Sequence, residues 1–129
     1  MTKIKAANLT GVQLRMAVAI ADGWTLVQIG EGPFNELMIR ITKDRDSQWF
    51  DQYDPTIPSG EGMTIVFRDG ISLIKVGIMN WRATLDYGNS SAPQFHDENP
   101  MIAAMRCYVA SKLGDEVELD AEGMLQCHA

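Results

Sequence analysis

The chain of 129 residues has little cysteine and no long apolar run. Its two cysteines, Cys107 and Cys127, cannot form the disulfide framework of a small secreted domain, so we expect two free thiols. No stretch approaches the roughly 18 to 20 apolar residues of a membrane span, and the N-terminus lacks the apolar core of a secretory signal. We therefore expect a protein that stays in the cytoplasm, with no membrane partner.

Basic residues are also scarce, because 11 Lys and Arg stand against 17 Asp and Glu for a formal net charge of -6. Such a chain has no basic surface to neutralise a phosphate backbone, so we do not expect a nucleic acid partner. An acidic surface could instead face a basic protein or mimic DNA. The carboxylates are dispersed along the chain, however, which favours an ordinary solvated acidic surface.

What the chain does have is enough apolar material for a core, since 46% of its residues are hydrophobic. We expect one globular domain over residues 1–129, with a mobile tail at about 120–129. Pro and Gly cluster in two segments, 44–62 and 86–98, which read as irregular. Long loops of this kind in a small domain are often either functional or mobile.

Two helices have clear boundaries in the sequence. Thr10 with Gln13 three residues later forms a capping-box pattern, and Gly23 offers a left-handed stop for this first helix. The last helix begins with Asn99 as its cap, followed by Pro100 at the first helical position, and ends at Gly114.

Between the helices we expect strands at residues 24–29, 37–42, 63–68, 71–76 and 79–85. The Asp69-Gly70 dipeptide between the third and fourth of these suits a tight hairpin turn. The predicted fold class is therefore α+β: an N-terminal helix, an antiparallel sheet of about four to five strands, and a C-terminal helix layered on it.

The last helix has more apolar surface than one sheet can cover. Its main stripe is expected to comprise Ile102, Met105, Val109 and Leu113, and Met101 and Tyr108 form a second patch to one side. We therefore predict a possible homodimer in which Met101 and Tyr108 are shielded by a second chain. The alternative is that the first helix or the long loops cover them.

Few residues suggest catalysis or metal binding. Asp44, Asp46, Asp51 and Asp54 could offer oxygen ligands to a cation, but their spacing does not fit a calcium loop, and a solvated acidic loop is favoured. Cys107 lies in an apolar helix where burial should raise its thiol pKa, which favours a structural cysteine. We expect no metal, no cofactor and no identifiable catalytic residue.

Binding candidates are easier to name. The loop aromatics Trp49, Phe50 and Tyr53 could stack on a planar ligand or anchor a partner, although packing against the sheet is the favoured interpretation. Arg106 lies close to the main apolar stripe and could bind an anion, although pairing with a carboxylate is more common. The ligand or partner candidates are Trp49, Tyr53, Asp54, Trp81 and Arg106.

Several motifs resemble those of the NinX-like proteins of tailed phages and prophages, a family of uncharacterised function. They are Leu9-Thr10-Gly11 and Ala17-Val18-Ala19, then Tyr53-Asp54-Pro55-Thr56, Arg68-Asp69-Gly70 and Trp81-Arg82-Ala83, and finally the run from Ile102 to Val117. One departure is Ile57-Pro58-Ser59, where family members often carry Thr-Asp-Trp. Any contact that the family makes through that Asp and Trp is lost here or moved to Trp49.

The resemblance implies a phage-encoded accessory protein in the bacterial cytoplasm. We expect it to act by binding a host protein or a small molecule, in host modulation or counter-defence, and not as an enzyme. One alternative is a small enzyme acting on a nucleotide-like substrate through Asp54, His96 and Arg106. Another is a structural self-assembling module.

Overall fold

The computed structural model describes residues 2–31, 37–57, 60–89 and 91–119. The expected tail at 120–129, with Cys127, lies outside the described residues. In chain order the elements are β1 (Thr2–Lys5), the 3-10 helix η1 (Ala6–Asn8), α1 (Gly11–Ala21), β2 (Thr25–Glu31), β3 (Leu37–Lys43), β4 (Asp46–Trp49), the 3-10 helix η2 (Phe50–Gln52), α2 (Glu61–Asp69), β5 (Ser72–Gly77), β6 (Asn80–Thr84), β7 (Phe95–Asp97), α3 (Pro100–Leu113) and β8 (Glu116–Leu119).

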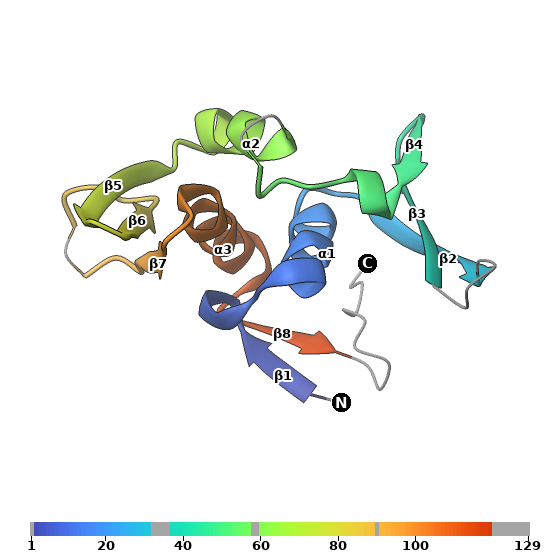
Figure 1. The fold of residues 1–129 in the computed structure, drawn as a ribbon, viewed down its shortest axis with the longest axis horizontal. Coiled ribbons are helices and arrows are strands. Elements are labelled where there is room, and N and C mark those ends of the chain that lie inside the picture. The colour runs from blue at the N-terminus through green and yellow to red at the C-terminus, as the bar shows by residue number, and fades with distance from the viewer. Residues whose placement is uncertain (1, 32–36, 58–59, 90, 120–129) are drawn as a thin grey trace.

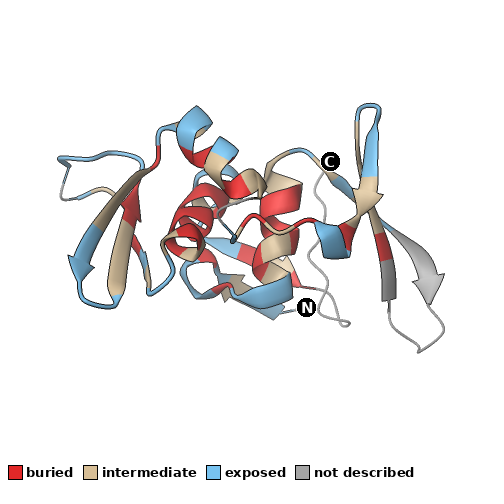
Figure 2. Cartoon of the chain, turned by 45° about the horizontal axis from the view of Figure 1, so that its top comes forward, coloured by how far each residue is buried: buried red, intermediate tan, exposed pale blue. Residues whose placement is uncertain are grey.

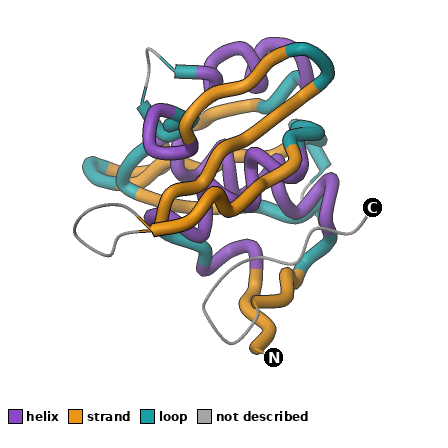
Figure 3. The backbone as a smooth tube through the Cα atoms, turned by 90° about the vertical axis from the view of Figure 1, so that its right-hand side faces the viewer, coloured by secondary structure: helices purple, strands orange, loops and turns teal. Residues whose placement is uncertain are grey.

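Helices α1 and α3 pack against each other at the centre of the molecule, and the sheets surround them (Figure 1). The β2–β3–β4 sheet lies at one end, the β5–β6–β7 sheet at the other, and β1 pairs with β8 below the helices. Buried residues concentrate on these central helices (Figure 2), and from the side of the β2–β3–β4 sheet the strands lie in front of the helices (Figure 3).

The α+β class is confirmed, and every strand pair of the described sheets is antiparallel. The expected single sheet of four to five strands is wrong, because the strands form three small sheets of two, three and three strands. The sheets are separate because the chain passes through α2 between β4 and β5, which places the two three-stranded sheets at opposite ends of the helical core.

Strands β1 and β8 were not predicted, because each is short and half charged. Their pairing places Lys3 directly opposite Glu118 and Lys5 opposite Glu116, with Ile4 opposite Val117 between them. Opposite charges and apolar side chains at directly paired positions stabilise an antiparallel pair. The signal is thus visible only once the two ends of the chain are aligned.

The hairpin predicted at residues 63–76 is wrong in its first half, because residues 63–68 belong to α2. Gly70 adopts a left-handed conformation (φ 70°) at the end of this helix, so Asp69-Gly70 ends a helix instead of turning a hairpin. The buried positions of α2 are 62, 65 and 66, which is the spacing of one helix face. The β-branched run at Ile65-Val66 suggested a strand, and tertiary packing overrides that propensity.

The boundaries of α1 and α3 are confirmed. Helix α1 follows Thr10, although the Thr10 side chain makes no capping hydrogen bond, and Gly23 has the expected positive φ of 92°. The Asn99 side chain accepts a hydrogen bond from the Met101 amide at 2.9 Å, as expected of an N-cap. No helix in the described part of the chain has the length and apolarity needed to cross a bilayer.

The second apolar patch of α3 is covered by α2, within the same chain. Met101 is 3% exposed and Tyr108 is 1% exposed. Met101 lies against Gly62, and Tyr108 contacts Arg68. The argument for a dimer assumed that both side chains lacked cover, and that assumption is wrong, because a segment read as a strand is the helix that covers them. The homodimer itself stays a prediction.

Gly62 allows α2 to lie this close, and replacing it tests the packing. A β-carbon at this position would overlap the Pro55 carbonyl oxygen and the Met101 methyl group. We predict that Gly62→Ala lowers the free energy of unfolding by about 1–3 kcal/mol, measured by urea denaturation. The control is Gly77→Ala, where the nearest atom would be Asn80 Cβ at 3.9 Å. Equal losses in the two variants would contradict this placement of α2.

Candidate binding site

The aromatic loop residues pack inward, as the favoured interpretation expected. Phe50 and Tyr53 are buried, and the Tyr53 ring meets Trp24 edge to face with 6.0 Å between centroids. Arg15 donates hydrogen bonds of 3.0 Å to the carbonyl oxygens of Phe50 and Tyr53, and its guanidinium lies 4.8 Å from the centroid of the Phe50 ring. Phe50 and Tyr53 therefore offer no open platform for a planar ligand.

Trp49 and Asp54 also have local partners. The Arg40 guanidinium lies 4.8 Å from the centroid of the half-buried Trp49 ring. Asp54 accepts hydrogen bonds from the amide and hydroxyl of Thr56, which shapes the turn before α2. Pro58 and Ser59, where the sequence departs from the family pattern, lie outside the described residues.

Arg106 is buried and serves as a structural anchor. Its Nε donates to the Leu9 carbonyl oxygen at 2.9 Å, and its Nη1 donates to the His96 carbonyl oxygen at 2.8 Å and to Asp97 Oδ1 at 3.2 Å. These bonds join α3 to the segment before α1 and to β7. Trp81 lies opposite Asp97 in the sheet, so Trp81 and Arg106 are the two candidates that share a neighbour.

The five binding candidates therefore do not form one site. Trp49 is the last residue of β4, and Tyr53 and Asp54 lie between β4 and α2, whereas Trp81 lies on β6 at the other end of the molecule (Figure 1). The proposed catalytic set is also divided, because Asp54 lies before α2, whereas His96 lies on β7 and Arg106 on α3. Arg106 binds the backbone of His96 and leaves the imidazole exposed, with Nδ1 3.5 Å from Asn80 Nδ2.

Cys107 and the described acidic residues were considered as a reactive thiol and as metal ligands, respectively. Burial raises the pKa of the Cys107 thiol to about 11, as the sequence predicted for a structural cysteine. Among the described residues, no three His, Cys, Asp or Glu side chains are grouped so that they could hold a metal ion. Asp44, Asp46 and Asp51 are exposed in the β3–β4 turn, β4 and η2.

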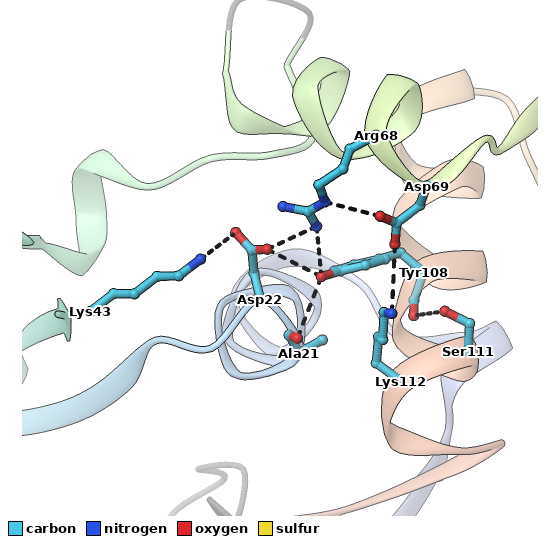
Figure 4. Close-up of polar contacts among 8 residues, drawn as sticks. All are labelled: Ala21, Asp22, Lys43, Arg68, Asp69, Tyr108, Ser111 and Lys112. Carbon is cyan, nitrogen blue, oxygen red and sulfur yellow. Dashed lines mark hydrogen bonds and ion pairs between the residues drawn. The ribbon is translucent and has the colours of Figure 1, made fainter.

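A polar cluster joins all three helices at one end of α1 (Figure 4). Arg68 Nη2 lies 2.9 Å from Asp22 Oδ1 and donates to the Tyr108 hydroxyl at 3.0 Å. That hydroxyl lies 3.2 Å from Asp22 Oδ1, so it can donate its own proton there. Lys43 adds a second cation 3.6 Å from Asp22 Oδ2, and Arg68 Nε also pairs with Asp69 at 2.9 Å.

The cluster is internally satisfied, which favours a structural role over a ligand site. Burial, followed by the negative charge of Asp22, raises the pKa of Tyr108 to about 12. The same two causes raise the pKa of the buried Tyr53. Both phenols therefore stay protonated at neutral pH, and the negative charge of Asp22 is matched by Arg68 and Lys43.

Two hollows flank the segment that connects β6 to β7. The first has a volume of about 130 Å³ and a largely apolar lining that faces α3: Leu85, Asp86, Ala92, Pro93, Phe95, Cys107, Ala110, Ser111 and Asp115. The second has a volume of about 290 Å³ and a polar lining: Arg82, Thr84, Asp86, Tyr87, Gly88, Asn89 and Gln94. Asp86 belongs to both.

The alternation of side chains along β6 separates the two hollows. Ala83 and Phe95 pair across β6 and β7 and are buried on the side of α3, whereas Arg82 pairs with Ile74 and His96 and points to the opposite face. Thr84 shares the face of Arg82, and Leu85 shares that of Ala83. The polar hollow therefore lies on the outer face of the sheet, and the apolar one lies between sheet and helix.

Arg82 has an unusual environment in the polar hollow. Its Nε atom is buried and, like the Tyr53 hydroxyl, has no hydrogen-bond partner among the described residues. Buried donors without a partner are uncommon in folded proteins, because each loses its hydration without replacement. We take the outer-face hollow around Arg82 as the candidate binding site.

This site was missed by sequence reasoning, although two signals pointed toward it. Residues 86–98 were identified as a long loop that could be functional, and Arg82 lies within the Trp81-Arg82-Ala83 motif. An arginine in the middle of a strand, beside residues that must be buried, could have been singled out as a half-buried charge. The placement of residues 86–89 and 94 beside Arg82 could not have been predicted from such a signal.

Arg106 provides the first test of this arrangement. Arg106→Met would leave the carbonyl oxygens of Leu9 and His96 without their donor, so we predict a loss of about 2–4 kcal/mol in the free energy of unfolding. Urea denaturation measures the loss, and Arg45→Met, at an exposed turn, is the matched control. Arg106→Lys should restore stability only in part, because an ammonium cannot reproduce the guanidinium geometry. A loss no larger than that of the control would contradict an anchoring role.

The raised pKa of Tyr108 predicts a loss of stability in alkali. Between its ordinary value of 10 and about 12, the unfolded chain gives up this phenol proton while the folded chain retains it. The unfolded state then binds fewer protons, so stability falls as pH rises through this window. We predict that Tyr108→Phe loses less stability than wild type across it, measured by urea unfolding at several pH values. Tyr87→Phe, at an exposed ring, is the control, and identical profiles for wild type and Tyr108→Phe would refute the assignment.

Comparison with known proteins agrees with the resemblance in the sequence. The family model described as Bacteriophage P22, NinX matches residues 5–112, a range that runs from the end of β1 to the last turn of α3. No curated protein matches the chain. Because the match covers most of the chain, the protein belongs to the phage NinX family.

Proposed function

We propose that this phage accessory protein acts by binding a host protein or a small molecule in the cytoplasm of the infected bacterium, and that it is not an enzyme. The family membership supports a phage accessory role. The observation that carries the binding proposal is the buried Nε of Arg82, which has no partner in the described structure and lies beside a hollow of about 290 Å³. A group bound in that hollow would lie against the Arg82 side chain.

The chemistry of the other ionisable groups supports binding over catalysis. A general acid or base needs a pKa near the working pH and access to a substrate. Tyr108 and Cys107 are buried with raised pKa values of about 12 and 11. Arg106 holds backbone carbonyls, and Arg68 is paired with Asp22 and Asp69. Arg106 and Arg68 therefore hold elements of the fold together, whereas Arg82 lines a hollow in which a ligand can meet polar groups.

Affinity capture from bacterial lysate tests the proposal. Tagged wild type, Arg82→Met and Arg45→Met are compared, and mass spectrometry identifies captured proteins and the small molecules released on denaturation. We predict at least one species that wild type and Arg45→Met retain and Arg82→Met loses. Arg45 is exposed between β3 and β4, so its replacement controls for the loss of one positive charge.

Two results would count against the proposal. Capture that is the same for wild type and Arg82→Met would reject the site. Empty captures for wild type under several conditions would remove the support for binding altogether.

A further inference from the structure

We infer that the outer-face hollow binds the oxyanion group, a carboxylate or phosphate, of a small planar organic ligand. This inference rests on the binding function proposed above and names the chemistry of the ligand. Arg82 carries the argument, because a guanidinium has five N–H donors and no acceptor, and its planar fork matches two oxygens of a carboxylate or phosphate. Arg82 lines the hollow, and its buried Nε has no partner within the described structure, so the protein does not use the whole donor fork of this guanidinium.

Two further donors line the same hollow. Thr84 is 3% exposed, and its hydroxyl oxygen accepts a hydrogen bond from the Asp86 amide at 3.3 Å. The hydroxyl proton therefore remains free to be donated to a ligand. Gln94 adds a side-chain amide with two N–H groups. Arg82, Thr84 and Gln94 thus provide a set of donors suited to an anionic group with several oxygens.

Asp86 limits what kind of anion can enter. It is the one carboxylate that lines the hollow, and its Oδ2 accepts a hydrogen bond from Asn89 Nδ2 at 2.9 Å. Asn89 Oδ1 in turn accepts from the Ser91 amide at 3.0 Å, so the loop itself holds Asp86 in place. A carboxylate beside Arg82 disfavours a polyanion such as a nucleic acid backbone. It favours a ligand with a single anionic group.

The size of the hollow and Tyr87 define the rest of the ligand. A volume of about 290 Å³ lies just below the range of roughly 300–1,000 Å³ for small-molecule sites, which suits a ligand of about one ring. Tyr87 lines the hollow and is 71% exposed, so its ring is accessible to a planar group. A monocyclic acid or phosphate monoester fits these constraints.

Titration followed by two-dimensional ¹H–¹⁵N NMR tests the inference on the full chain. The probes are benzoate and phenyl phosphate, and benzamide serves as the neutral match for benzoate. We predict saturable shifts of the Thr84 and Asn89 backbone amides and of the Gln94 side-chain amide with at least one anion, and no saturable shift with benzamide. Saturation with benzoate alone would define a carboxylate site, and saturation with phenyl phosphate alone a phosphate site.

Variants locate the binding within the hollow. Arg82→Met should weaken binding at least roughly tenfold, because the bidentate partner is lost, whereas Arg45→Met should bind as wild type does. Thr84→Val preserves the shape of the side chain, removes one donor and should weaken binding several-fold. The spectrum of each variant without ligand reports whether it is folded.

Three outcomes would overturn the inference: no saturation by either anion up to about 10 mM, equal binding of benzamide, or unchanged affinity in folded Arg82→Met. If the anions fail while capture from lysate still depends on Arg82, the ligand chemistry is wrong and the binding function stands. If that capture fails as well, both fall.

Discussion

The buried Arg106 guanidinium is the contact on which the rest of the arrangement depends. It lies on α3 and bonds to the carbonyl oxygen of Leu9, 97 positions away in sequence, and to His96 and Asp97 on β7. Through Leu9 it places the start of α1 beside α3. Through β7 it fixes the edge of the sheet that contains Arg82. The candidate site is thus positioned by a residue that takes no part in it.

The other side of α3 is organised by a second charge network of different character. Asp22, Arg68 and Tyr108 bring the end of α1, the end of α2 and the middle of α3 together, and Lys43 extends the network to β3 (Figure 4). Arg106 holds backbone atoms, whereas this network joins side chains from separate elements. Arg106 and Arg68 each bond to groups of the fold through their guanidinium nitrogens. Arg82 differs from them, because its Nε has no hydrogen-bond partner among the described residues.

Local signals predicted the two central helices, because Asn99, Pro100, Gly23 and Gly114 act within a few residues of the boundaries they set. Helix α2 was misread because Asp69-Gly70 suits a hairpin turn and a helix end equally well. The choice between them is made by contacts of Gly62 with Pro55 and Met101, which no local pattern reveals. The partners of Arg106 are mostly backbone carbonyls, which have no sequence signature. The Arg82 site depends on strand register and on where residues 86–89 and 94 lie, and no local sequence pattern reveals either.

The pairing of β1 with β8 has a consequence for the order of folding. Lys3 and Glu118 are directly paired, although almost the whole described chain separates them in sequence. Their contact therefore closes a very long loop. Contacts of such separation gain little until the intervening chain has been ordered. The contact between Arg106 and Leu9 shortens the loop that β1 and β8 must close, because it brings the segment after β1 beside the helix that precedes β8. We therefore expect the two-stranded sheet to form after the helical core and to open before it.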